Sequence, residues 1–116
     1  MIKWRRIILL YRAVSIDELI DIQQCEKFRS SSNSMLGKWF AETTFDVAEW
    51  GRQFYQWNQV PFSVIQVDVP DYIAEQMFRI TNLDNIGSAM WASEGELLDL
   101  INSTNNGIIE LSTVPI

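Results

Sequence analysis

The chain has 116 residues, a formal net charge of −6, no histidine and a single cysteine. Its length suits one domain, and its 47% hydrophobic and 21% charged residues are typical of a folded globular protein. The residue counts exclude a disulfide within the chain, zinc sites of the common Cys/His type, and any histidine general base. The acidic balance argues against binding nucleic acid through net charge. We therefore expect one domain over residues 1–116, with no metal.

The N-terminal segment is basic, but the apolar run that follows it is too short for a targeting or membrane signal. That run covers 7–11, whereas a signal peptide needs roughly 7–15 apolar residues and a membrane-spanning helix roughly 18. We therefore expect no membrane insertion by this domain, and any export signal to lie outside this sequence.

Local sequence patterns predict alternating strands and helices along the chain. β-Branched runs and alternation of apolar with polar residues indicate strands, and capping residues followed by apolar positions at helical spacing indicate helices. The capping residues expected are Ser15 with Glu18, Thr43 or Thr44, and Ser93 with Glu96. In chain order the predicted elements are a strand at 7–14, a helix at 16–25, a polar loop at 27–37, a strand at 38–43, a helix at 45–57, a strand at 62–69, a helix at 70–77, a turn at 84–87, a strand at 87–92, a helix at 93–102, a turn at 103–107 and a strand at 108–114.

This order of elements favours an α+β fold. The connections are short, and the Gly-rich first turn of a doubly wound parallel sheet is missing from the sequence. We therefore expect a mostly antiparallel, split sheet flanked by short helices.

Arg12 is unusual because it interrupts a strand that otherwise reads as buried. An arginine in such a strand must be paired with a carboxylate or must face a cleft. Glu18 and Glu42 are the candidate partners if Arg12 is a paired structural residue. A ligand-binding role for Arg12 is the alternative.

Three segments, taken in order, resemble a known family. They are Leu-Tyr-Arg-Ala-Val at 10–14, Gly-Lys-Trp-Phe-Ala-Glu at 37–42, and Val-Asp-Val-Pro at 67–70. Together they resemble the ADP-ribosyltransferase fold, and more closely the small ADP-ribosyltransferase-like toxin domains at the C-termini of bacterial Rhs-type and contact-dependent polymorphic toxins. The likeness covers about residues 9–112 and extends distantly to the catalytic fold of poly-ADP-ribose polymerases.

The resemblance implies that NAD is the substrate and suggests which residues bind it. Arg12, with Ala13 beside it, takes the place of the first-strand residue that holds the ribose or phosphate of NAD, and a guanidinium suits that chemistry. Trp39 takes the place of a tyrosine that stacks on nicotinamide. Asn33, in the polar loop, is a further candidate for contact with the polar edge of the ligand, although it also fits a simple turn.

The sequence departs from this family at the catalytic glutamate. The family places a glutamate in a late strand, where this chain has Ser88 or Ala89. Glu42 is the expected substitute, acting with Arg12, because a carboxylate stabilises positive charge that develops on the ribose. Glu94 and Glu96 superficially match a Glu-x-Glu pair, but the capping interpretation of Glu96 is preferred.

The resulting expectation is an NAD-dependent ADP-ribosyltransferase toxin that modifies a protein or RNA in a competitor or host cell. The alternatives are an NAD glycohydrolase toxin, and a catalytically silent binding or immunity-type interaction protein. By the same resemblance, the domain is the C-terminal part of a longer secreted chain, acts in the cytoplasm of the target cell, and has a cognate immunity protein.

Overall fold

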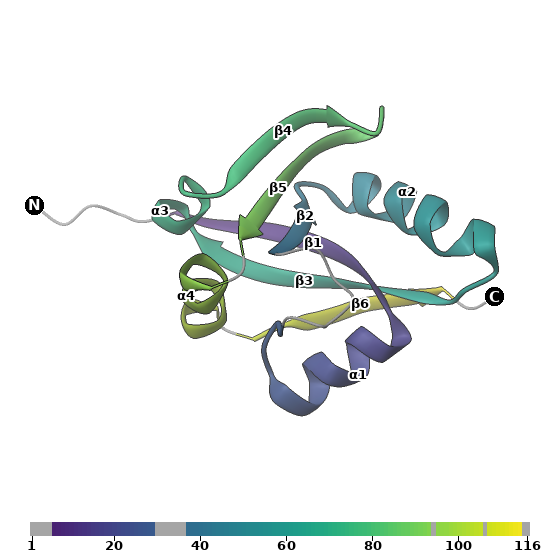
Figure 1. The fold of residues 1–116 in the computed structure, drawn as a ribbon, viewed down its shortest axis with the longest axis horizontal. Helices are drawn as coiled ribbons and strands as arrows, with labels where there is room; N and C mark the ends of the chain where they lie inside the picture. The colour runs from purple at the N-terminus through teal and green to yellow at the C-terminus, as the bar shows by residue number, and fades with distance from the viewer. Residues whose placement is uncertain (1–5, 30–36, 94, 106, 115–116) are drawn as a thin grey trace, which may run out of the picture.

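The fold was analysed in a computed structural model, which describes residues 6–29, 37–93, 95–105 and 107–114. Its strands and helices alternate along most of the chain (Figure 1). The elements are β1 (Ile7–Ser15), α1 (Ile16–Cys25), β2 (Gly37–Ala41), α2 (Thr44–Phe54), a 3-10 turn η1 (Gln56–Asn58), β3 (Phe62–Pro70), α3 (Asp71–Ala74), β4 (Phe78–Leu83), β5 (Gly87–Ser93), α4 (Glu96–Thr104) and β6 (Ile109–Val114).

The strands form one six-stranded sheet in the order β4-β5-β2-β1-β3-β6, and every neighbouring pair is antiparallel. The expected α+β class with an antiparallel sheet is therefore confirmed. The central strand β1 pairs with β3 along its whole length, from Ile7 opposite Pro70 to Ser15 opposite Phe62. Its pairing with β2 is confined to Tyr11 opposite Ala41. The two halves of the sheet are thus joined by a very short ladder at the end of β2 (Figure 1).

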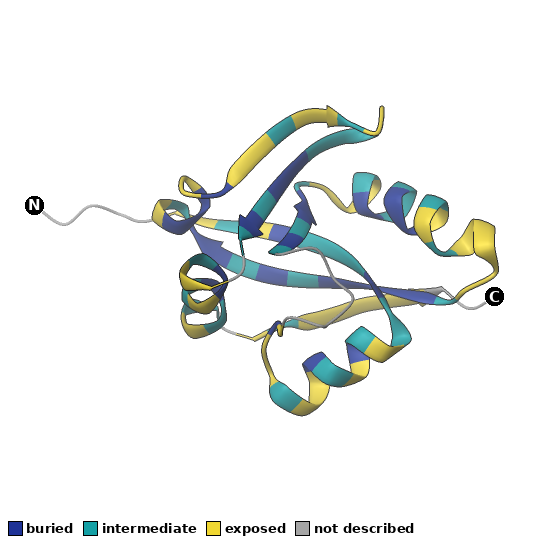
Figure 2. Ribbon diagram, viewed as in Figure 1, coloured by how far each residue is buried: buried dark blue, intermediate teal, exposed yellow. Residues whose placement is uncertain are grey.

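Helices cover the two faces of the sheet unequally. The larger hydrophobic core lies between the sheet and α1, α3 and α4, and a smaller core lies between the sheet and α2. Buried residues concentrate on β3, β5 and the inner sides of the helices, whereas β4 and β6 are largely exposed (Figure 2). The face beneath α2 is consequently only partly covered.

The apolar pattern of β3 follows from this unequal cover. Phe62 and Val64 pack under α2, whereas Val67 and Val69 point to the other face and pack in the larger core. Successive residues of a strand alternate between faces, so Gln66 lies on the α2 face, beyond the reach of the helix. Ile65 packs in the larger core directly after Val64 packs in the smaller one, so the buried side of β3 changes between these two residues.

Two of the three expected helix caps are confirmed. The hydroxyl of Ser15 accepts a hydrogen bond from the Glu18 backbone N–H at 3.1 Å, and Thr43 caps α2. The third expectation was wrong, because Ser93 ends β5 and Gly95 precedes α4 without a side-chain cap. The strand continues further than the capping pattern indicates because Ser93 pairs with Gly37 in β2.

The sequence analysis missed one strand and misjudged the second helix. β4 forms between the predicted helix 70–77 and the predicted turn 84–87, where no element was expected, and it pairs with β5 through Phe78 opposite Trp91. The turn between them was predicted, and Asn82, Asp84 and Asn85 there have left-handed backbone angles that Asn and Asp tolerate. In the predicted helix 45–57 the apolar spacing misleads, since Phe45 is 81% exposed.

Gly51 explains how α2 packs so closely on β3. A Cβ atom at Gly51 would lie only 2.1 Å from the Phe62 ring, so the bare backbone of the helix rests on this side chain. Glycine weakens a helix by about 1 kcal/mol relative to alanine. Close packing on Phe62 therefore outweighs local helix propensity at this position.

We expect Gly51→Ala to destabilise the protein, although alanine is the better helix former. Forcing a methyl group against Phe62 costs about 1–3 kcal/mol, which exceeds the gain in propensity of about 1 kcal/mol. Urea unfolding measures the difference, and Phe62→Leu in the Gly51→Ala background should recover part of it. A Gly51→Ala protein more stable than wild type would contradict the close contact.

Candidate functional site

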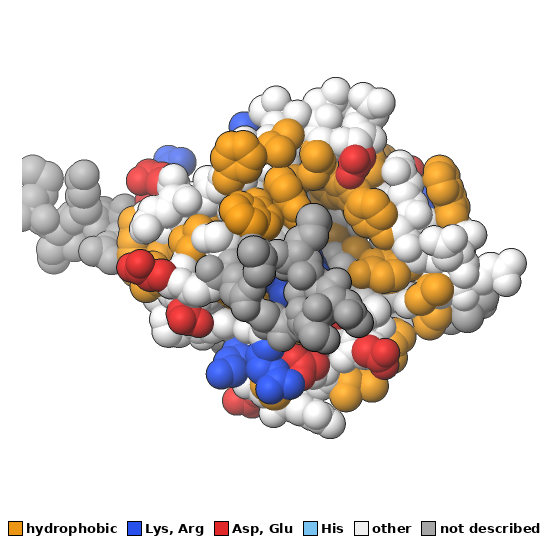
Figure 3. Space-filling model, viewed as in Figure 1, with side chains coloured by type: hydrophobic (Ala, Val, Ile, Leu, Met, Phe, Trp, Pro, Cys, Tyr) orange, Lys and Arg blue, Asp and Glu red, His pale blue; other side chains and the backbone are white. Residues whose placement is uncertain are grey.

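A cavity of about 430 Å3 lies where β1, β2 and α2 meet, beside the short ladder between the two halves of the sheet. Its walls are mainly apolar and aromatic, and this size and composition are typical of small-molecule sites. Hydrophobic side chains gather around the hollow in the space-filling view (Figure 3). The residues that line it are Tyr11, Arg12, Ala13, Trp39, Phe40, Ala41, Val47, Trp50, Phe54, Tyr55, Leu83, Asp84 and Ala89.

Three residues expected to contact a cofactor meet at this cavity. Arg12 and Ala13 reach it from β1, and Trp39 reaches it from β2, although 27 positions separate Arg12 from Trp39 in the chain. The separation of β1 from β2 beyond Tyr11 opens the space that these side chains enter. Arg12 leaves β1 on the side of the larger core and Trp39 leaves β2 on the side of the smaller one, so the two residues line the same cavity from opposite faces of the sheet. Their roles stay a prediction.

Arg12 is held tightly by three hydrogen bonds. Its Nε and Nη2 donate to the two carboxylate oxygens of Glu18 at 2.7 and 2.9 Å, and Nη1 donates to the backbone oxygen of Trp39 at 3.1 Å. A guanidinium has five N–H donors, so two remain beyond these bonds. Of the two partners that the sequence offered, Glu18 is the one that pairs. Arg12 both forms this ion pair and lines the cavity.

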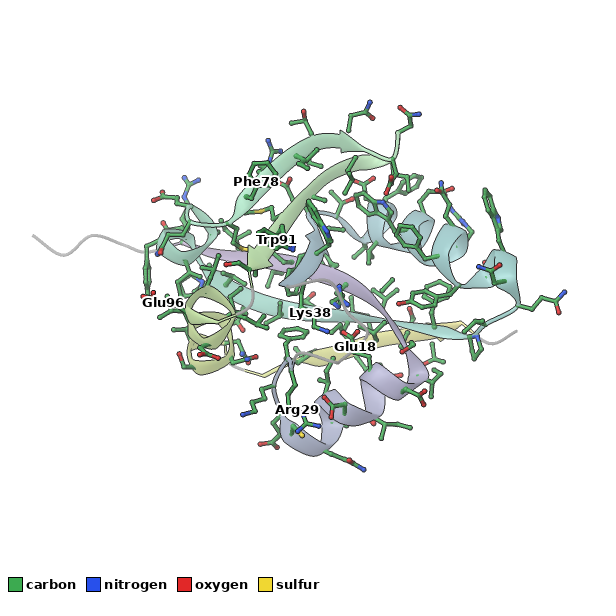
Figure 4. All side chains as sticks on the ribbon, viewed as in Figure 1. Glu18, Arg29, Lys38, Phe78, Trp91 and Glu96 are labelled. Carbon is green, nitrogen blue, oxygen red and sulfur yellow. The ribbon has the colours of Figure 1, made fainter. Side chains whose placement is uncertain are left out.

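Lys38 joins this ion pair as a buried second cation. Its side chain is 4% exposed, and its Nζ lies 3.6 Å from a carboxylate oxygen of Glu18 (Figure 4). Burial lowers the pKa of Lys38, an effect that the negative charge of Glu18 only partly offsets and the positive charge of Arg12 reinforces. We call Arg12, Glu18 and Lys38 the buried ion cluster.

The carboxylate of Glu18 is stabilised in its charged form within this cluster. Burial by itself would raise its pKa, but the hydrogen bonds and charge of Arg12, with the charge of Lys38, outweigh burial and lower the pKa. Burial likewise opposes the charge of Arg12, and the bonds to Glu18 outweigh it and raise the pKa of Arg12. Glu18 therefore pairs with both Arg12 and Lys38, and the cluster keeps an excess of positive charge beside the cavity.

Two further polar groups lie at the cavity wall. The indole N–H of Trp50 donates to a carboxylate oxygen of Asp84 at 3.1 Å, which ties α2 to the turn after β4. The phenol of Tyr55 is largely buried, and this burial raises its pKa despite the nearby positive charge of Arg12. Among the described residues, Asp84 is the one carboxylate that lines the cavity.

Glu42 does not meet the expectation that it faces the cofactor site. Its carboxylate accepts a hydrogen bond from Nε of Arg79 at 2.8 Å, and it is not among the residues that line the cavity. Arg79 sits opposite Met90, which packs in the larger core, so this pair lies on the other face of the sheet from Trp39. Alternation along β2 is the physical reason, because Glu42 follows Ala41, and Ala41 faces the cavity.

The remaining candidate residues are distributed differently from the expectation. Asn33 and Glu94 lie outside the described residues. Glu96 begins α4, on the far side of the sheet from α2, and does not line the cavity (Figure 4). Ala89, which stands in one of the two positions aligned with the missing glutamate, does line it and presents only a methyl group there.

Sequence reasoning missed Lys38, Trp50, Tyr55 and Asp84. A signal existed for Lys38, since it shares the inward alternation of Phe40 in a short strand. Trp50 was recognised as an apolar helix position but not as a cavity residue. Asp84 sits in a predicted turn, and its closeness to Trp50 depends on how the β4–β5 hairpin folds back, which local sequence does not encode.

Other kinds of site find no support within the part of the chain that the structure describes. There, no group of three or more Cys, Asp or Glu side chains is placed to hold a metal ion. None of the described helices is both long enough and apolar enough to cross a membrane.

Comparison with protein families, with curated proteins and with solved structures finds no match for this chain. The site is therefore interpreted from its own geometry.

We expect neutral replacement of Glu18 and of Lys38 to have different effects on the stability of the protein. Glu18→Gln leaves two buried cations without a counter-charge and should cost about 3 kcal/mol of unfolding free energy. Lys38→Met removes a desolvated cation while the Arg12–Glu18 pair remains, so stability should change by less than about 1 kcal/mol or rise. Urea unfolding at pH 7 measures both. Equal losses in the two variants would contradict this account.

The lowered pKa of Glu18 also predicts how stability depends on pH. Its stabilising contribution is present in full above the unfolded-state pKa of glutamate, about 4.3, and is lost as pH falls through the lower folded-state pKa. Wild type should therefore lose part of its advantage over Glu18→Gln on going from pH 7 to pH 3. Unfolding curves of both proteins at these two pH values test this. An undiminished difference at pH 3 would show that Glu18 is not the titrating group.

Proposed function

We propose that this domain binds NAD in the cavity and transfers its ADP-ribose group to an acceptor. The observation that carries the proposal is the meeting of Arg12, Ala13 and Trp39 in one cavity, from two separate segments that resemble ADP-ribosyltransferases. A split antiparallel sheet of ADP-ribosyltransferase type is part of the same proposal, and the short pairing of β1 with β2 supports it.

The cavity offers the right chemistry for the nicotinamide end of NAD. Trp39 and Trp50 supply flat apolar surface for an aromatic ring. The two N–H donors of Arg12 that are not used by Glu18 or Trp39 are suited to a phosphate or ribose oxygen. Because Glu18 fixes the guanidinium, Arg12 would meet the ligand already oriented.

In the proposed reaction the bond between the ribose C1′ and the nicotinamide nitrogen breaks, and its electron pair stays with nicotinamide. The acceptor then forms a bond to C1′ and releases a proton. Positive charge that develops on the ribose needs a nearby carboxylate. Asp84 is the described carboxylate at the cavity, so it replaces Glu42 in this role. Water as the acceptor would make the protein an NAD glycohydrolase.

The wider setting of this activity is proposed on the family resemblance. The domain would be delivered into the cytoplasm of a competitor or host cell, modify a protein or RNA there, and be blocked by a cognate immunity protein. The cavity is the surface that such an inhibitor would have to cover.

Binding of NAD without turnover is the second candidate function. Two observations favour it: Asp84 already accepts a hydrogen bond from Trp50, and Ala89 offers no carboxylate. An immunity-type interaction protein would also lack turnover, but it has no need of an aromatic cavity. Measuring binding and nicotinamide release together separates these functions.

We expect incubation with NAD to release nicotinamide, with or without cell extract as a source of acceptor. Trp39→Ala should weaken NAD binding about 10-fold through loss of a ring contact, and Asp84→Asn should lower the rate about 10²-fold with less effect on binding. Phe45→Ala, in α2 but 81% exposed and away from the cavity, is the matched control. Chromatography of nicotinamide and calorimetry of NAD binding provide the two measurements.

Each outcome decides between the candidates. Heat of NAD binding without nicotinamide release would favour the binding function over transfer. Neither binding nor release would overturn both, and so would release that persists unchanged in the Trp39→Ala variant.

A further inference from the structure

Three aromatic residues lie side by side across β2, β5 and β4. Trp39 is directly opposite Trp91, and Trp91 is directly opposite Phe78. Residues opposite each other in antiparallel strands share a face, so all three side chains are on the side of the sheet that carries the cavity. The rings of Trp39 and Trp91 are 6.3 Å apart at an angle of 42°. We call Trp39, Trp91 and Phe78 the aromatic stripe.

The aromatic stripe is open to solvent, in contrast to the core aromatics. Phe78 is 59% exposed and Trp39 and Trp91 are half-buried, whereas Phe28 and Phe40 are buried in the larger core. Figure 4 labels Phe78 and Trp91 on neighbouring strands, and Figure 3 shows hydrophobic side chains over the same region. The stripe begins at the cavity, since Trp39 lines both, and it runs outward to the edge strand β4.

Gly37 holds the central ring of the stripe against the backbone. A Cβ atom at Gly37 would lie 2.6 Å from the indole nitrogen of Trp91, so the absence of a side chain there lets the indole rest on β2. A ring fixed in this way loses little conformational freedom when it binds a ligand. The central ring of the stripe is therefore already in position before a ligand binds.

The charge distribution indicates what kind of group the stripe accepts. The nearest residue to Phe78 along β4 that carries a charge is Arg79, which is engaged with Glu42 on the other face of the sheet. The excess of positive charge lies in the buried ion cluster, of which Arg12 lines the cavity. A flat, uncharged ring suits the stripe, whereas a phosphate group suits the end near Arg12.

We propose that the aromatic stripe is a stacking site for the adenine base of the dinucleotide, an inference that rests on the proposed function. NAD carries two ring systems joined by phosphates, and the cavity accounts for one of them. With strands about 4.8 Å apart, the stripe extends roughly 10 Å from Trp39, a span that the linker of a dinucleotide can bridge. Stacking on Trp91 and Phe78 makes the site selective for dinucleotides over mononucleotides of nicotinamide.

The test compares three ligands by calorimetry on the full chain. NAD carries both rings, nicotinamide mononucleotide lacks adenine, and AMP lacks nicotinamide. Trp91→Ala should weaken the binding of NAD and of AMP about 10-fold, because one base–aromatic stack is lost. It should leave the binding of nicotinamide mononucleotide unchanged. Phe78→Ala should act in the same direction. Trp57→Ala, a 74% exposed tryptophan on η1, is the control and should change none of the three.

The outcomes separate this inference from the proposed function. AMP binding that depends on Trp91, without release of nicotinamide from NAD, supports the stripe and overturns the transfer reaction. Binding of nicotinamide mononucleotide with no binding of AMP overturns the stripe and leaves the cavity. Equal weakening of the binding of all three ligands by Trp91→Ala also overturns it, unless Trp91→Phe, which keeps a ring, restores the binding of NAD and AMP more than that of nicotinamide mononucleotide. Absence of binding by all three ligands overturns both proposals.

Discussion

The side chain of Arg12 connects β1 and β2, two strands that line the cavity, to α1. Its own strand, β1, pairs with β2 only around Tyr11, so the two halves of the sheet have few backbone hydrogen bonds between them. Arg12 bridges the gap by donating to the backbone oxygen of Trp39 on one side and to Glu18 of α1 on the other. A charge in this position needs its partner, because a buried, unpaired guanidinium would be far too costly.

The buried ion cluster has a chemical consequence as well as a structural one. Lys38 adds a second cation that Glu18 serves only in part, which is why burial dominates and its pKa is lowered. In the proposed function, this excess of positive charge would attract the phosphate groups of NAD to the adjoining cavity, even though the whole chain carries a net charge of −6.

The partial cover of the sheet defines the rest of the site. α2 packs on Phe62 and Val64 at one end of the sheet face and leaves the other end without a helix. The uncovered part carries the aromatic stripe, whose side chains are set on strands rather than on loops. These rings are held by the strands, and the bare backbone at Gly37 lets the indole of Trp91 lie against β2, so they are fixed without a ligand.

The sequence by itself determined most of the elements, because β-branched runs, alternation and the caps at Ser15 and Thr43 act over a few residues. It also singled out Arg12, since an arginine in an apolar strand must be paired or face a cleft, and the family resemblance singled out Trp39. Only the tertiary structure decided the rest. β4 forms by pairing with β5, and alternation along β2 places Glu42 against Arg79 instead of at the cavity. The turn after β4 places Asp84 beside Trp50. The physical reason is that these contacts join residues far apart in the chain, and neighbouring residues carry no record of them.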